Sequence, residues 1–208
     1  MTTALPLRAA KADRPLRGAI VGLTLASRPV SAGIAVLGAG SAAPFVTTVS
    51  SAECRDRVAD HLARHRSLVD EIMAAVLDQC ESVAMIVIED LSHVSAADSP
   101  QCRAHVWWEL VNRLHCLGVP VAVCAPSTLK KFAVGTGNAK KLEVFGAAQH
   151  LYPELVLKKD DEADAIFLAL IGAVALGRET PLSATQTRRK VLTAVQWPDA
   201  ERGAPVPF

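Results

Sequence analysis

The sequence has few aromatic residues, few cysteines and almost no net charge. Its 208 residues include 4% aromatic side chains, five cysteines and a formal net charge of +1. The balanced charge excludes a uniformly basic coat, so any surface that binds nucleic acid must be local. An odd, scattered cysteine set without a CxxC pair excludes a disulfide framework and predicts reduced thiols in the cytoplasm: Cys54, Cys80, Cys102, Cys116 and Cys124.

The sequence also lacks an apolar run long enough to cross a membrane comfortably. The longest run, residues 163–177, contains Asp164 and is shorter than the roughly 20 residues that a spanning helix needs. No apolar signal segment stands at residues 1–16. Half of the residues are hydrophobic, which is enough for one well-filled domain. We therefore expect no membrane association, a flexible arm over 1–16, one domain over 17–177 and an extended tail over 178–208.

The order of apolar patterns predicts an α/β fold. Two to three adjacent apolar runs with short turns favour an antiparallel meander, and two later runs are apolar throughout, as in central parallel strands covered on both sides. Between and after these, the period becomes helical. We expect a five-stranded mixed sheet, three strands antiparallel and two parallel, with helices on both faces. Expected strands are 17–25, 31–38, 45–49, 83–89 and 119–124, and expected helices are 53–80, 99–117, 138–150 and a final one after 160.

Three carboxylates stand where this fold would bring them together. Glu89 ends the fourth strand, and ligands in such sheets lie at the carboxyl ends of strands. Asp161 and Asp164 begin the last helix and share one of its faces. Hard divalent cations prefer carboxylate oxygens, so the set predicts a metal site. Acidic residues at a helix start also interact favourably with its dipole, by about 0.3–1 kcal/mol, and taken alone Asp161 has that simpler explanation.

A lysine-rich segment at 127–143 is a candidate for phosphate binding. Its two glycines permit positive φ, and Asn138 suits the N-cap of the following helix. Lys140 and Lys141 in the first turn would then oppose the helix dipole, a conflict that a bound phosphate removes. A solvated loop explains the segment equally well. The candidate DNA-binding residues are Lys130, Lys131, Gly135, Gly137, Asn138, Lys140 and Lys141.

Histidine and tryptophan pairs add weaker signals. His61 and His65 are four residues apart, but no neighbouring thiol or carboxylate completes a zinc site, so we expect surface residues. Trp107 and Trp108 are consecutive on an expected helix and point in different directions. One belongs in the core, whereas the other could mark a subunit interface.

Together these segments resemble RuvC-like Holliday-junction resolvases, particularly those of phages that infect actinobacteria. The matching blocks are VGLTLASRPVSAGIAVL, VAMIVIED, VPVAVCAPSTLKKFAVGTGNAKKLEV and DDEADAIFLALIG, within residues 17–177. The resemblance implies an RNase H-like fold, a homodimer in the cytoplasm (the host's, for a phage protein), and nicking of branched DNA. It also implies Mg²⁺, with Mn²⁺ as a substitute, no small-molecule cofactor, and catalytic acids at Glu89, Asp161 and Asp164.

One position departs from the family's pattern. Where the family has an aspartate on the first strand, this chain has Thr24, so the site loses a negative charge and a metal ligand. If that ligand stabilised the transition state by about 4 kcal/mol, its loss would slow the reaction roughly a thousandfold. Two functions stay open: an impaired endonuclease, or a weak or inactive junction-binding or assembly protein. An actin-like kinase starts with a similar β-turn-β, but the chain is too short for its two lobes.

Overall fold

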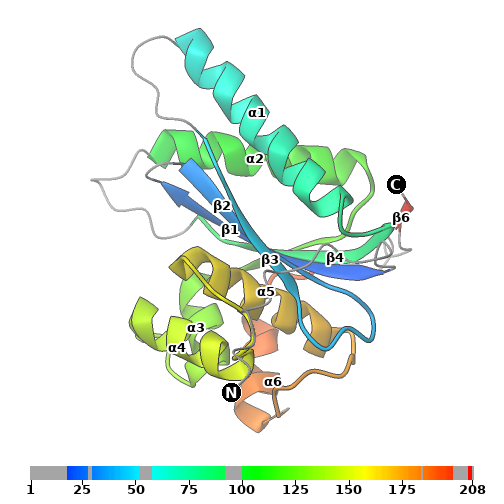
Figure 1. Cartoon of the computed structure of the whole chain (residues 1–208), viewed down its shortest axis with the longest axis vertical. Helices are drawn as coiled ribbons and strands as arrows, with labels where there is room; N and C mark the ends of the chain where they lie inside the picture. The colour runs from blue at the N-terminus through cyan, green and yellow to red at the C-terminus, as the bar shows by residue number, and fades with distance from the viewer. Residues whose placement is uncertain are drawn as a thin grey trace, which may run out of the picture.

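One mixed β-sheet lies between two layers of helices (Figure 1). The structure, a computed structural model, describes residues 18–27, 30–51, 58–91, 100–183, 185–198 and 206–207. The predicted arm over 1–16 falls outside these ranges. Apolar side chains fill the space on both sides of the sheet, forming one core on each face.

The sheet confirms the predicted mixture of strand directions. Its strands are β1 (Ala19–Ser27), β2 (Val30–Leu37), β3 (Phe45–Ser50), β4 (Ser82–Glu89) and β5 (Val121–Cys124). They lie in the order β3-β2-β1-β4-β5. The first three pair antiparallel, and β4 runs parallel to both β1 and β5. The sequence did not predict a sixth strand, the two-residue β6 (Val206–Pro207), which pairs antiparallel with the start of β4.

Helices cover both faces, as predicted. On one face lie α1 (Val58–Leu77) and α2 (Pro100–Cys116), and on the other α3 (Pro126–Val134), α4 (Lys141–Leu151) and α5 (Asp160–Ala175) (Figure 1). After its acidic first turns, the helix α5 is apolar all round, and it is buried along nearly its whole length, because the sheet covers one side of it and α3 and α4 cover the other. The fold thus holds the first turn of α5 in a fixed place.

Two glycines let α5 approach the sheet closely. A Cβ at Gly22 in β1 would stand 2.0 Å from the carbonyl oxygen of Ala165, and one at Gly33 in β2 would stand 2.3 Å from that of Asp161. Any other residue would therefore push the helix away. Since Gly33 is paired with Thr24 in the sheet, this contact brings the start of α5 beside the strand position that Thr24 occupies.

The lysine-rich segment differs from its prediction. Residues 126–134 form the helix α3 instead of a turn and loop, because Pro126 suits a first helical position and Leu129 and Phe132 bury one helix face. Of the two glycines, only Gly135 has a positive φ, at the end of α3. Gly137 instead lies close to Ser127, whose carbonyl oxygen would be 3.1 Å from a Cβ there.

The following helix also starts later than predicted. Its N-cap is Lys140, not Asn138, and its first residue is Lys141. The carboxylate of Glu143 accepts a hydrogen bond of 2.6 Å from the backbone N–H of Lys140. A glutamate three residues into the helix therefore supplies the cap.

The sequence suggested an extended tail after residue 177, but the structure shows that these residues are not simply extended. They include α6 (Gln186–Val191) and the 3-10 turn η1 (Leu192–Ala194). Arg188 donates from Nε to the carbonyl oxygen of Phe132 at 3.1 Å, fastening α6 to α3. Gln196 then pairs with Val123 on β5 through two backbone hydrogen bonds of 2.9 Å.

None of the helices described between residues 58 and 191 is long and apolar enough to cross a membrane. The most apolar of them, α5, has 16 residues and begins with three acidic side chains.

Candidate active site

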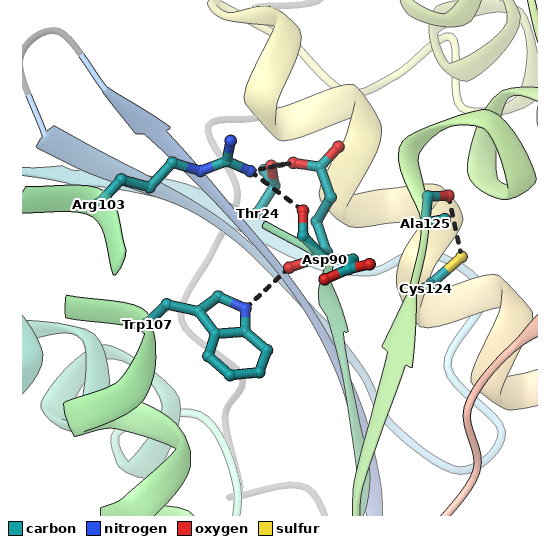
Figure 2. Close-up of polar contacts among 7 residues, drawn as sticks. Thr24, Asp90, Arg103, Trp107, Cys124 and Ala125 are labelled. Atoms are coloured by element: carbon teal, nitrogen blue, oxygen red, sulfur yellow. Dashed lines mark hydrogen bonds and ion pairs between the residues drawn. The ribbon is translucent and has the colours of Figure 1, made fainter. Parts of the chain in front are cut away.

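The carboxylate of Glu89, at the end of β4, is the centre of a polar network. Thr24 donates its hydroxyl to Glu89 Oε2 at 2.8 Å, and Arg103 on α2 donates from Nη2 to the same oxygen at 3.2 Å. Trp107 donates its indole N–H to the carbonyl oxygen of Glu89 at 2.9 Å (Figure 2). Only 12% of the Glu89 side chain and 8% of the Arg103 side chain are exposed. Hydrogen bonds from β1 and from α2 thus hold Glu89 in this position.

The other two acids come from the opposite helix layer. Asp161 and Asp164 lie in the first turns of α5, a helix that is capped by a third acid, Glu162. Glu162 Oε2 accepts the backbone N–H groups of Lys158 and Lys159 at 2.6 and 3.3 Å, while Thr48 of β3 donates to its Oε1 at 3.1 Å. Glu162 therefore caps the start of α5, and the side chains of Asp161 and Asp164 are not needed for this capping.

All three candidate acids have raised pKa values, and charges within the set contribute to the rise for Glu89 and Asp164. Burial, then the charge of Glu89, raises the pKa of Asp164 to about 7. Burial also raises the pKa of Asp161. For Glu89, burial raises the pKa, and the charge of Asp161 adds to the rise, while Arg103 and the Thr24 hydroxyl oppose it. The structure thus brings the predicted acids into one electrostatic neighbourhood, at a cost to their ionised forms.

The donor set fits a hard divalent cation. Three carboxylates that repel one another offer the oxygen ligands that Mg²⁺ and Mn²⁺ prefer, and a cation between them would relieve that repulsion. Their oxygens do not all lie within 4.8 Å of one another in the structure. Glu89 is instead drawn to Thr24 and Arg103, so binding a metal requires its side chain to share or leave the guanidinium.

The lysines divide into two groups around this site. Lys141, at the start of α4, lies 4.0 Å from Asp160 between Nζ and Oδ2, and its charge lowers the pKa values of all three candidate acids. Lys140 is exposed next to it. Lys130 and Lys131 lie on α3, where Lys130 is half-buried and Lys131 exposed.

Sequence reasoning missed Arg103 and Trp107 as part of the site. Both are on α2 four residues apart, so they share one helix face, and that face meets the end of β4. A signal was available: Arg103 is a charged residue within an apolar helix face, flanked by Val106 and Leu110, which are both fully buried. The partner of such a charge on a neighbouring strand could not be identified from the sequence.

Comparison with known proteins adds sequence relatives and a shared fold. No protein-family model matches the chain. A crossover junction endodeoxyribonuclease RuvC from Zymomonas mobilis is 30% identical over 115 residues, which is 54% of this chain and 66% of that protein. The RuvC of Methylorubrum extorquens strain PA1 is 35% identical over 72 residues, 32% of this chain and 38% of that protein. The chain thus matches less than two thirds of the length of these relatives.

Solved structures agree with these relatives. The RuvC of Thermus thermophilus superposes with a TM-score of 0.56 at 17% identity, covering 79% of this chain and 99% of that one. The same protein in complex with a Holliday junction substrate gives a TM-score of 0.56 at 15% identity.

This chain is RuvC-like. Its RuvC-like sheet has the RNase H-like arrangement that the resemblance implied, with the meander first and the parallel strands after it. In this RuvC-like chain, Thr24 lies on the first strand, β1, and its hydroxyl is hydrogen-bonded to Glu89 at the end of β4.

Proposed function

We propose that this protein is a metal-dependent endonuclease of reduced activity that acts on four-way or other branched DNA. One observation carries the proposal: Glu89 from β4 and Asp161 and Asp164 from α5 are close enough that, in addition to burial, the charge of Asp161 raises the pKa of Glu89, and the charges of Glu89 and Asp161 raise the pKa of Asp164. Sequence likeness to proteins named crossover junction endodeoxyribonuclease supports the same substrate class.

Each acid would have a separate part in the reaction. When bound, Mg²⁺ or Mn²⁺ would activate water and stabilise charge on the scissile phosphate. Asp161 and Asp164 would hold the ion from the rigid start of α5. Glu89 would be the adjustable ligand, since Arg103 and Thr24 already compete for its Oε2. The site therefore suits slow turnover better than fast turnover.

A second function has its own support. Thr24 is neutral and only 2% exposed, and the positive charge of Arg103 already compensates Glu89. Because Thr24 is uncharged and Arg103 already neutralises Glu89, this site has less negative charge for a metal ion to compensate. On this basis the alternative is an inactive protein that binds DNA junctions or serves as an assembly subunit, without cutting.

Nicking of a labelled four-way junction distinguishes the two. We expect slow, Mg²⁺- or Mn²⁺-dependent nicking by the wild type, loss of nicking in Asp161→Asn, and a gain of one to three orders of magnitude in Thr24→Asp, which is about 1.4–4 kcal/mol. Asp78→Asn, on the exposed loop after α1, is the matched control. Unchanged nicking in Asp161→Asn would overturn the site. No nicking by wild type, restored by Thr24→Asp, would favour the second function.

The DNA-binding surface would continue from the acids over the lysines. Lys140 and Lys141 are exposed at the start of α4. Lys141 Nζ lies 4.0 Å from Asp160 Oδ2, and its charge acts on all three candidate acids. A phosphate near the acids would therefore be flanked by these lysines. Lys130, Lys131 and the 135–138 turn would contact the backbone further away.

Salt dependence measures this surface. Lys141→Ala should weaken junction binding and reduce the slope of log affinity against log salt by about one. The matched control is Arg66→Ala, because Arg66 is an exposed cation on α1, across the sheet. Equal slopes for the wild type and Lys141→Ala would exclude this surface.

A homodimer is also proposed, on the basis of the two tryptophans. Trp107 is 6% exposed and packs in the core, whereas Trp108 is 63% exposed on α2, edge to face with its neighbour. Large exposed aromatics are enriched at interfaces. Sedimentation should show a dimer in the wild type and a shift towards monomer in Trp108→Arg, while a wild-type monomer would exclude the interface.

A further inference from the structure

Two histidines and a cysteine meet between α1 and α2, on the face of the sheet away from α5. His61 and His65 come from α1 and Cys102 from α2, and one ligand atom of each lies within 4.8 Å of the other two. Among the residues that the structure describes, no other three metal-binding side chains meet this condition. The expectation of a surface position was wrong for His65, which is buried, and the expectation that no thiol lies nearby was wrong for both histidines. The thiol was missed because Cys102 follows His65 only after 36 intervening residues.

The central histidine is buried without a full set of hydrogen bonds. His65 is 7% exposed, and its Nδ1 has no hydrogen-bond partner. An unsatisfied buried nitrogen costs about 1–3 kcal/mol, so its position calls for a ligand. A fourth donor is also close: the ring centroid of His105, on α2, lies 5.1 Å from that of His65.

We propose that this chain binds one Zn²⁺ between α1 and α2 through His61, His65 and Cys102. Two imidazoles and a thiolate favour a borderline-soft cation over the hard Mg²⁺ that carboxylates prefer. On binding, the Cys102 thiol would lose its proton to solvent and form the metal–sulfur bond. Zinc takes four ligands at structural sites, and His105 is the nearest candidate for the fourth.

The position of the site gives it a structural role. Cys102 directly precedes Arg103, which contacts Glu89, and Trp107 on the same helix contacts the backbone of Glu89. A metal joining the start of α2 to α1 would therefore fix the helix that holds the acid at the end of β4. The ion would stabilise the active-site wall and take no part in the hydrolysis.

Cobalt titration of the full-length protein tests the site, after chelation and removal of the chelator. Co²⁺ is a spectroscopic substitute for Zn²⁺, and a thiolate ligand gives it a charge-transfer absorption in the near ultraviolet. We expect one Co²⁺ per chain with this absorption, displaced by Zn²⁺ but not by excess Mg²⁺. Zn²⁺ at about one hundred times its Kd should raise the melting temperature by about 5–10 °C.

Matched variants decide the ligands. Cys102→Ser should lose the absorption, and His61→Ala should weaken Co²⁺ binding at least tenfold, roughly the minimum for losing a group that supports a metal. Cys116→Ser is the control, since Cys116 is exposed on the same helix. Absence of the absorption in the wild type, its survival in Cys102→Ser, or its loss in Cys116→Ser would each overturn the proposal. If Cys102→Ser fails to fold by circular dichroism, His61→Ala decides.

Discussion

The two helix layers hold the acids of the candidate site in different ways. On one face, α5 lies directly on β1 and β2, with backbone against backbone at Gly22 and Gly33. On the other, α2 reaches the end of β4 through side chains, the guanidinium of Arg103 and the indole of Trp107. The backbone of Asp161 and Asp164 therefore moves only if the helix moves, whereas the Glu89 carboxylate is held by hydrogen bonds from other side chains and can exchange them.

This difference separates a fixed part of the site from an adjustable one. Close-packed backbones leave no room for small shifts, so the backbone of α5 that carries Asp161 and Asp164 keeps a constant position. Hydrogen bonds at 2.8 and 3.2 Å hold the third, and a competing cation can replace them. Substitutions at the contact of α5 with the sheet should therefore destabilise the protein through packing, while those on the α2 side should destabilise it through charge.

The strongest test of the fixed part is Gly22→Ala. Its new Cβ would fall 2.0 Å from the Ala165 carbonyl oxygen and 2.5 Å from the Ala169 nitrogen. Both are backbone atoms that cannot rotate away. We expect a loss of about 3 kcal/mol or more in the free energy of unfolding, measured by urea denaturation. Gly146→Ala, where a Cβ meets nothing within 4 Å in the helix α4, should be neutral or gain about 0.5–1 kcal/mol. Equal effects would contradict the backbone contact.

On the adjustable side, Arg103→Ala removes the partner of a largely buried carboxylate. We expect a loss of about 3 kcal/mol at pH 8, and a smaller loss at acidic pH, where Glu89 is protonated. Arg113→Ala on the same helix is the matched control: Arg113 pairs with Asp70 and Glu109 at a more exposed position, so its loss should cost less than about 1 kcal/mol. A pH-independent loss in Arg103→Ala would mean that packing, not charge, is what Arg103 supplies.

Asp164 should produce a smaller, pH-dependent effect. Its folded pKa is raised from 3.8 to about 7, so the protonated form stabilises the fold below pH 4, and this stability is lost as pH rises through 7. A pKa shift of about three units corresponds to about 4 kcal/mol in the free energy of unfolding. Partial exposure of Asp164 to solvent should reduce this to about 2 kcal/mol. Thermal unfolding from pH 4 to 8 should show the decline in the wild type and a flatter curve in Asp164→Asn. Added Mg²⁺ should restore wild-type stability at pH 8, and no response would count against a metal at Asp164.

The sequence was sufficient for the five main strands and for the closeness of the three acids. Apolar runs at 83–89 and 119–124 gave the parallel strands because strands covered on both faces are hydrophobic on both sides. Glu89, Asp161 and Asp164 could be placed together because strand ends and helix starts meet at the same edge of such a sheet. These features depend on local pattern and simple topology.

Contacts between distant segments could not be obtained in the same way. Nothing local pairs Arg103 with Glu89, or Cys102 with His65, since each depends on how α2 packs. The helix α3 was missed because the Pro-Ser pair and the two lysines at 126–131 are typical of a turn and a solvated loop, yet burial of Leu129 and Phe132 outweighs that preference. Lys140 was placed two positions too far into its helix, because the N-cap is Lys140 with Glu143 completing the cap, and not Asn138.

The backbone pairing between Gln196 and Val123 covers part of a sheet edge that could otherwise pair with a strand of another copy. Without that contact, β5 would be an open sheet edge whose N–H and C=O groups invite another strand. The residues after α5 close this edge at Val123, and β6 pairs with the start of β4 beyond it. A chain shortened at the end of α5 would keep every candidate site residue yet expose an adhesive edge. We expect such a shortened chain to aggregate more readily than the full chain.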